Sequence, residues 1–229
     1  LTILSLLNQT ARPSKILLWL DKDEFELSNL PEQLISLTAY GLKIHFCHNI
    51  RSYKKLIPTL NLYPNEPVIT FDDDVIYPID HIDRLLVAHE QFPESVACHR
   101  AHRMLKNNSG EGLLPYKAWE FDISATQPAF DVFPVGIGGV LYPQNALHSD
   151  VLLENKFMQC APFGDDIWFK MLAIKNNVKA MTVSNPMPIS DYIMLPESQT
   201  DSLWGKNKLR NDEQIIKVLK AYPEVMRLI

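Results

Sequence analysis

The chain has 229 residues, of which 46% are hydrophobic and 21% charged, so it is long enough for one α/β domain with a sizeable core. Its formal net charge of −5 argues against a nucleic-acid-binding protein, because such a protein needs a basic surface. No run of about 18 apolar residues predicts a membrane-spanning segment, and residues 1–7 lack the basic start and cleavage site of a signal peptide. Three widely spaced cysteines suit free thiols in a reducing compartment, so we expect a cytoplasmic protein.

Helices and strands are expected to alternate through the first hundred residues. The sequence begins with the end of an amphipathic helix at 1–9, and further helices are predicted at about 31–40, 56–60 and 80–91. Runs of apolar and β-branched residues predict buried strands at 15–20, 42–47, 67–71 and 95–99. Gly41 is expected to end the helix before the second of these strands. This alternation is typical of a parallel, doubly wound sheet.

The pattern changes after residue 100. A basic cluster at 99–104, a polar loop at 107–112 and an aromatic-rich segment at 116–133 show no helical period. A glycine-rich segment with flanking apolar residues at 135–143 follows, then a helix from Gly164 to about residue 176 and a short strand at 179–183. Residues 185–205 are proline-rich and irregular, and Asn211 with Gln214 is expected to cap a last helix that ends near residue 221. With no internal repeat or linker, the sequence predicts one domain.

Three consecutive carboxylates follow the predicted strand at 67–71. Asp72, Asp73 and Asp74 lie where open α/β sheets bind their ligands, at the carboxyl end of a strand. Adjacent carboxylates repel one another, and a divalent cation with phosphate oxygens as its other ligands offsets that repulsion. The alternative is an acidic surface turn after a core strand.

Three segments in this order resemble the GT-A glycosyltransferases, in particular the family 2-like bacterial enzymes of capsule and surface-polysaccharide synthesis. Asp72-Asp73-Asp74 matches their Asp-x-Asp motif, and residues 135–143 resemble the glycine-containing strand at their donor–acceptor junction. Residues 164–169 resemble the acidic helix start where such enzymes carry a catalytic or acceptor-binding carboxylate.

The resemblance implies a fold. We expect a single Rossmann-like GT-A domain over 1–229, an α/β structure with a mixed, mostly parallel sheet flanked by helices. Residues 1–100 would form the nucleotide-sugar-binding half and 101–229 the acceptor-binding half. GT-A domains begin with a strand whose loop holds the nucleotide base, and this sequence begins with the helix that follows it.

The resemblance also implies a reaction. Such a hexosyltransferase moves a sugar from a nucleotide-diphosphate sugar, here expected to be a UDP-sugar, to a glycan or lipid-linked acceptor. Mn²⁺ or Mg²⁺ stabilises the negative charge left on the departing diphosphate. Asp74 is expected to bind the metal directly, with Asp72 as a second ligand that also faces the ribose and Asp73 in support. The enzyme would be cytoplasmic and able to associate with the inner face of the membrane.

Two groups of residues are expected to contact the donor. Arg51, Lys54 and Lys55 lie at the start of the helix before the metal-binding strand and are expected to reach the nucleotide side, with Arg51 and Lys54 near the donor diphosphate. The alternative for all three is a solvated helix start. Gly138 and Gly139 would let the backbone approach the sugar closely, unless they form a simple β-bulge.

The acceptor side requires a base and a surface for the sugar ring. Asp166, or its neighbour Asp165, is expected to take the proton from the acceptor hydroxyl; alternatively, Asp165 only caps its helix. Trp119 and Trp204 are the candidates for stacking on the acceptor, although tryptophan is more often a core residue.

Two other functions stay open. A haloacid-dehalogenase-like phosphatase would use Asp72 as nucleophile, Asp74 as acid/base, and Asp165 with Asp166 as its later magnesium motif. In that family the nucleophile follows an early strand and the later acids end a hydrophobic strand, and this sequence fits neither expectation well. A non-catalytic sugar-binding module on a transferase fold would bind glycan without metal or nucleotide.

Overall fold

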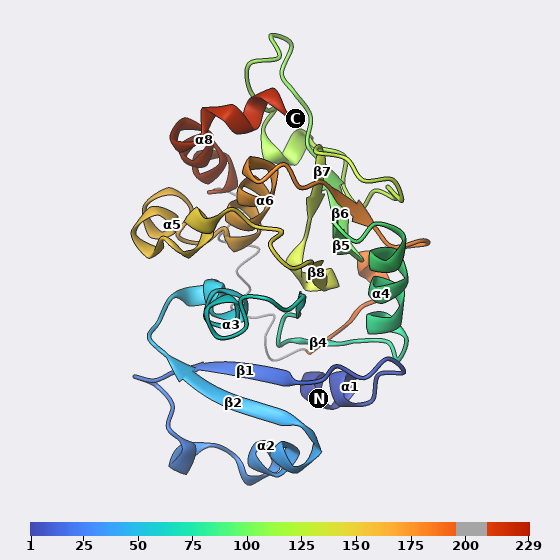
Figure 1. Cartoon of the computed structure of the whole chain (residues 1–229), viewed down its shortest axis with the longest axis vertical. Helices are drawn as coiled ribbons and strands as arrows, with labels where there is room; N and C mark the ends of the chain where they lie inside the picture. The colour runs from blue at the N-terminus through green and yellow to red at the C-terminus, as the bar shows by residue number, and fades with distance from the viewer. Residues whose placement is uncertain (196–209) are drawn as a thin grey trace.

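The protein is a mixed α/β structure, seen in a computed structural model that describes residues 1–195 and 210–229 (Figure 1). Its α-helices are α1 (Thr2–Leu7), α2 (Glu32–Ser36), α3 (Ile57–Leu62), α4 (His81–Gln91), α5 (Glu154–Cys160), α6 (Asp165–Lys175) and α8 (Asn211–Ala221). Its strands are β1 (Ile16–Asp21), β2 (Leu42–Cys47), β3 (Val68–Thr70), β4 (Val75–Ile76), β5 (Val96–Cys98), β6 (Ala101–Arg103), β7 (Val132–Pro134), β8 (Val140–Tyr142), β9 (Ala180–Thr182) and β10 (Ile193–Met194). None of the described helices is both long and apolar enough to cross a membrane.

The sheets are smaller and less parallel than the sequence predicts. The largest sheet of the described residues has four strands in the order β3-β8-β5-β9. Strand β8 pairs antiparallel with both β3 and β5, and only β5 and β9 run parallel in this sheet. The expectation of a mostly parallel sheet is therefore wrong, because β8 arrives from the second half of the chain and separates two strands of the first half.

The first two strands form a parallel sheet of their own. Strands β1 and β2 pair in register over six residues each, and they lie apart from the larger sheet (Figure 1). A 3₁₀ turn, η2 (Leu37–Tyr40), leads to Gly41, whose φ of 112° lies in the region that favours glycine. Strand β2 thus has the predicted bounds, and β1 is shifted by one residue from the predicted 15–20. Gly41 ends the helical segment as predicted, although its last turn is 3₁₀ and α2 stops at Ser36. Strands β1 and β3 are not paired with each other.

Helices cover both faces of the four-stranded sheet. Helix α4 lies on one side and α6, flanked by α5 and α8, on the other (Figure 1). Side chains alternate between the two faces, as strand geometry requires: Ala97 packs with Leu85 of α4, while Val96 and Cys98 belong to the cluster that contains α6. Helix α6 is buried nearly all round, from Ile167 to Ile174.

The core also fixes the segment that precedes α3. The 3₁₀ turn η3 (Arg51–Lys55) carries Tyr53, which is fully buried and stacks on Phe157 of α5 with ring centroids 4.1 Å apart. The Tyr53 hydroxyl donates to the carbonyl of Ala161, 2.6 Å away. This aromatic anchor holds η3 against the approach to α6.

Sequence patterns predicted the later helices better than their caps. Helix α6 begins and ends close to the predicted positions, and α8 ends at Ala221 as expected. Arg210 is the N-cap residue of α8, and its side chain makes no capping hydrogen bond. Gln214 accepts instead from the backbone N–H of Phe163, at 2.8 Å, so its predicted capping role is wrong.

Candidate functional site: two acidic segments around Lys55

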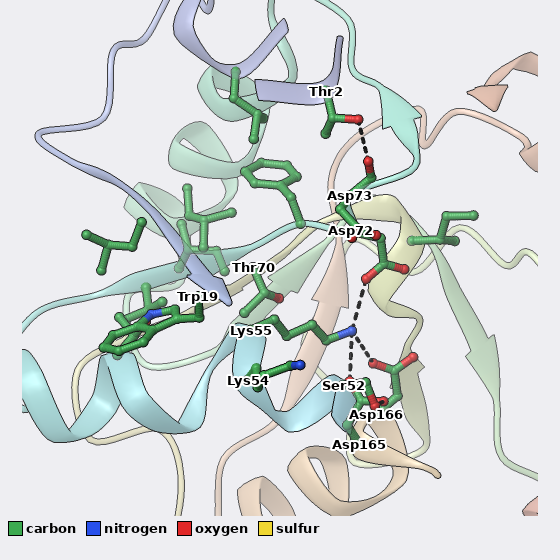
Figure 2. Close-up of a pocket in the computed structure, with 18 of the residues that line it drawn as sticks. Thr2, Trp19, Ser52, Lys54, Lys55, Thr70, Asp72, Asp73, Asp165 and Asp166 are labelled. Carbon is green, nitrogen blue, oxygen red and sulfur yellow. Dashed lines mark hydrogen bonds and ion pairs between the residues drawn. The ribbon is translucent and has the colours of Figure 1, made fainter. Parts of the chain in front are cut away.

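A pocket of about 1410 Å³, here called the main pocket, is lined by β1, η3, β3, the turn after β3 and the start of α6 (Figure 2). Residues 16–19 of β1 and 68–70 of β3 both line it, so the pocket extends into the space between the two sheets. Its wall is therefore apolar on the strand side, with Trp19 there, and acidic at the end where β3 stops. That combination suits a ligand with a flat apolar part and an anionic part held through a cation.

Lys55 joins the two acidic segments at the pocket. Its ammonium nitrogen lies 2.8 Å from Asp165 Oδ2, 3.1 Å from Asp72 Oδ1 and 3.6 Å from Asp166 Oδ1 (Figure 2). Burial opposes the charge of this lysine, but the three carboxylates outweigh it and raise its pKa well above the usual value. The segments that lie some ninety residues apart in the sequence are thus held together by one cation.

Asp166 has the chemistry of a base that works near neutral pH. Its Oδ2 accepts the backbone N–H of Gly136 at 2.9 Å, which fixes the carboxylate at the start of α6. Burial raises the pKa of Asp166 to about 7; Lys55 opposes this shift, and Asp165 adds to it. A general base is most effective when its pKa is close to the working pH.

Asp165 supports this arrangement and does not cap its helix. The N-cap position of α6 is Gly164, and no side chain there makes a capping hydrogen bond. Asp165 is 8% exposed; its Oδ1 accepts the Ser52 hydroxyl at 2.8 Å while its Oδ2 faces Lys55. The alternative that Asp165 only caps α6 is therefore not what the structure shows.

The other acidic segment forms a turn between β3 and β4. Asp72, Asp73 and Asp74 all line the main pocket, with Asp73 exposed and its neighbours half-buried. The backbone of the turn is held from two sides, because the Thr2 hydroxyl donates to the Asp73 carbonyl at 2.8 Å and the Asp72 N–H donates to the Tyr77 hydroxyl at 3.1 Å. The carboxylates thus project from a fixed backbone.

The chemistry of this turn fits Mg²⁺ or Mn²⁺ that is bound partly by a ligand. Among the described residues no group of three or more His, Cys, Asp or Glu side chains is arranged to hold a metal ion. Mg²⁺ is commonly bound through one or two carboxylates together with substrate phosphates, and it needs no such group. Asp72 and Asp74, which face the same pocket, supply two carboxylates of this kind.

Sequence reasoning grouped Lys55 with its neighbours but did not single it out. Arg51, Lys54 and Lys55 were all expected to reach the nucleotide side, and Lys55 is the one that pairs with both acidic segments. In a 3₁₀ turn residues three apart share a side, so the Ser52 and Lys55 side chains both reach Asp165. The buried Tyr53 between them fixes that orientation, and only the tertiary contact reveals it.

Sequence reasoning overlooked Gly136, in the glycine-rich segment. A Cβ atom at this position would lie 2.6 Å from the Lys55 nitrogen and 2.8 Å from Asp166 Oδ1. Any side chain would therefore displace the charged groups. The sequence signal was a third glycine, two residues before Gly138 in the same segment.

The chosen glycines pack elsewhere. A Cβ at Gly138 would lie 2.8 Å from the backbone nitrogen of Arg100, and Gly139, with a φ of 82°, packs against the ring of Phe71. Neither glycine is among the residues that line the main pocket. Their donor contact stays a prediction, and the close approach that the structure shows is between protein segments.

The predicted acceptor surface is not at the pocket either. Trp119 is 4% exposed, and its indole N–H donates to the Leu114 carbonyl at 2.9 Å. Its ring packs 4.8 Å from Tyr116 and 5.3 Å from Phe133, so the structure places Trp119 in the core and corrects its predicted stacking on the acceptor. Trp204 lies outside the described residues.

The two cations predicted at the donor diphosphate both line the main pocket but have different surroundings. Lys54 is half-buried and lines the main pocket beside Lys55 (Figure 2). Arg51 is exposed; its Nη1 donates to the Pro162 carbonyl at 3.1 Å, and its guanidinium lies 4.0 Å from the centre of the Phe163 ring.

Comparison with known proteins assigns the chain to no family. No family model matches the chain, and no curated protein matches it significantly.

Proposed function

We propose that this chain is a GT-A-type glycosyltransferase that moves a hexose from a nucleotide-diphosphate sugar, with a UDP-sugar as the expected donor, to a glycan or lipid-linked acceptor. The observation that carries the proposal is the Lys55 cluster, in which an acidic turn and a buried acidic helix start meet at one large pocket. The proposal includes a cytoplasmic location at the inner face of the membrane, where a lipid-linked acceptor would be available.

The donor would lie along the wall formed by β1 and β3, with its diphosphate at the acidic turn. The pocket volume of about 1410 Å³ is more than a compact metabolite needs and leaves room for a nucleoside, a diphosphate and a sugar. Asp74 and Asp72 would hold Mn²⁺ or Mg²⁺, which when bound would stabilise charge on the leaving diphosphate. Lys54, at the same pocket, would add a positive charge near the phosphates.

Asp166 would take the proton from the acceptor hydroxyl. A carboxylate with a pKa of about 7 accepts a proton near neutral pH more readily than an ordinary aspartate does. Gly136 and the rigid start of α6 hold the carboxylate in place, so little conformational entropy is lost when the acceptor binds. Lys55 keeps Asp166 close to the acidic turn, where the sugar would be transferred.

The surroundings of Asp165 and Asp166 argue against the phosphatase alternative. That fold places its later acids at the end of a hydrophobic strand, whereas here the acids open α6 and the segment before them is helix α5. A non-catalytic sugar-binding module would need neither a buried base nor an acidic turn. The presence of both at the main pocket therefore favours the transferase over the binding module.

A thermal-shift screen of nucleotide sugars, with and without Mn²⁺, tests the proposal. A ligand present at about 100 times its dissociation constant stabilises the fold by about 2.7 kcal/mol. We expect stabilisation by one nucleotide-diphosphate sugar, larger with Mn²⁺ and reduced when the matching nucleoside replaces it. Stabilisation by free glycan alone, with no response to any nucleotide sugar, would favour the binding module and contradict the proposal.

A further inference from the structure

Two arginines pack against one aromatic ring at the edge of the main pocket. The guanidinium carbon of Arg51 lies 4.0 Å from the centre of the Phe163 ring, and that of Arg210 lies 4.7 Å from the same centre. Phe163 and Arg51 both line the pocket, as does Asn211, the residue after Arg210. Both arginines are exposed, so their charged groups are open to a ligand.

Neither arginine is neutralised within the part of the chain that the structure describes. No ion pair joins either guanidinium to a carboxylate there, while Lys55, four residues from Arg51, pairs with three. The carboxylates that follow Phe163 are already engaged: Asp165 with Ser52 and Lys55, and Asp166 with Gly136 and Lys55. Two like charges at one ring repel each other, and a shared anion would offset that repulsion.

The backbone holds Arg51 in an uncommon conformation. Its φ of 56° lies in the left-handed region, where a residue with a side chain is uncommon, and its N–H donates to Asn49 Oδ1 at 2.9 Å. The Nη1 group donates to the Pro162 carbonyl at 3.1 Å. A guanidinium has five N–H donors, and within residues 1–195 and 210–229 the hydrogen bond to Pro162 uses one of those on Arg51.

We propose that Arg51, Phe163 and Arg210 form a phosphate-binding site for the acceptor, an inference that rests on the proposed glycosyl transfer. Planar guanidinium groups bind phosphate through paired N–H donors, and stacking on a ring fixes their orientation in advance. Proximity to the proposed base favours an acceptor role for this site, because Phe163 lies three residues before Asp166. The ion pairs connect Asp72 to this segment only through Lys55. Arg51 is thus reassigned from the donor diphosphate to the acceptor.

The phosphate would belong either to a phosphorylated glycan or to a lipid-linked diphosphate sugar. Both present the same group to the two arginines, and two probes separate them: a hexose 1-phosphate and a short-chain prenyl diphosphate hexose. Tighter binding of one probe to the wild type identifies the source.

The test is calorimetric titration of both probes in the presence of a metal chelator, which removes any contribution of a metal ion. Arg51→Gln together with Arg210→Gln should weaken the binding of both probes about tenfold or more, since two charge-assisted contacts are lost. Lys117→Gln together with Lys220→Gln, which removes two exposed cations elsewhere, should change the affinity less than about twofold. Arg51→Lys with Arg210→Lys should give an intermediate loss, because lysine keeps the charge without the planar donors.

The same titrations separate this inference from the proposed function. Asp74→Ala should leave metal-free binding of the probes unchanged. If nucleotide sugars bind but the probes bind equally well to the wild type and to the Arg51→Gln, Arg210→Gln variant, the phosphate site is wrong and the transferase proposal stands. If the arginine variant loses the probes and the wild type binds no nucleotide sugar, the phosphate site stands and the transferase proposal fails. Binding of glucuronate as tightly as hexose 1-phosphate would overturn the assignment to phosphate.

Discussion

The molecule carries two acidic segments with the same residue type in different surroundings. Asp72, Asp73 and Asp74 form an open turn after β3, whereas Asp165 and Asp166 begin a helix that is buried nearly all round. Burial raises the pKa of Asp166 to about 7. Surroundings, more than residue type, thus decide which acid can hold a cation and which can take up a proton.

Lys55 contacts both acidic segments, so its replacement should have the largest effect. Lys55→Met leaves three carboxylates without their shared cation, and losing one partner of a buried pair costs about 3–5 kcal/mol. We expect a loss of stability of that order in urea unfolding at about pH 8. Lys54→Met, one residue away on the same turn, is the control and should cost well under half as much. Equal losses in the two variants would mean that the cluster does not hold the segments together.

Asp166→Asn should separate the base from the ligand-binding acids. Asparagine keeps an oxygen for the Gly136 N–H but takes up no proton, so turnover should fall about a hundredfold or more while donor affinity is retained. Asp165→Asn keeps an acceptor for Ser52 and should reduce turnover by less than about tenfold. Initial transfer rates and donor affinities of both variants decide this. Wild-type turnover in Asp166→Asn would remove that residue from the mechanism.

The same substitution predicts a pH dependence of stability. Because the folded pKa of Asp166 is about 7, and that of an unfolded aspartate is about 3.9, folding favours the protonated form. Its contribution to stability is complete below about pH 4 and is lost as the pH rises through about 7. The free energy of unfolding of Asp166→Asn, relative to that of the wild type, should therefore rise by roughly 2–3 kcal/mol between about pH 4.5 and pH 8. Urea unfolding measures this. If the free energies of unfolding of variant and wild type differed by the same amount at both pH values, the pKa of this carboxylate would not be raised in the folded protein.

Lys54 should give the smallest effect. It lines the pocket beside Lys55 but makes no ion pair within the described residues. Lys54→Gln should weaken nucleotide-sugar binding by about two- to fivefold at low salt, and less at high salt, because screening removes a partly exposed charge. The ratio of dissociation constants at two salt concentrations measures this. A ratio that is the same for variant and wild type would leave Lys54 without a part in binding.

Local patterns in the sequence predicted much of the fold. Strands β1 and β2 follow from runs of apolar residues, Gly41 from its place after a helix, and the start of α6 from Gly164 and the acids after it. Each of these signals depends on neighbours in the sequence. The insertion of β8 between β3 and β5 depends on long-range pairing, and no pattern within either half of the chain reveals it.

The candidate site was predicted by segment more accurately than by residue. Both acidic segments face one pocket, as expected. The sequence placed Lys54 and Lys55 together and did not reveal that Lys55 makes the ion pairs, because a buried Tyr53, not charge spacing, fixes the turn. Trp119 was placed at the acceptor on chemistry alone, while its indole is held in the core by the Leu114 carbonyl.

Metal-dependent binding of a UDP-hexose tests the central claim most directly. In calorimetric titrations with Mn²⁺, the wild type should bind, Asp74→Ala should lose Mn²⁺-dependent binding, and Asp166→Asn should bind about as tightly as the wild type. Circular dichroism of each variant would verify that the fold is intact. Unchanged UDP-hexose affinity in Asp74→Ala, or its loss in Asp166→Asn alone, would contradict the division of roles between the two acidic segments.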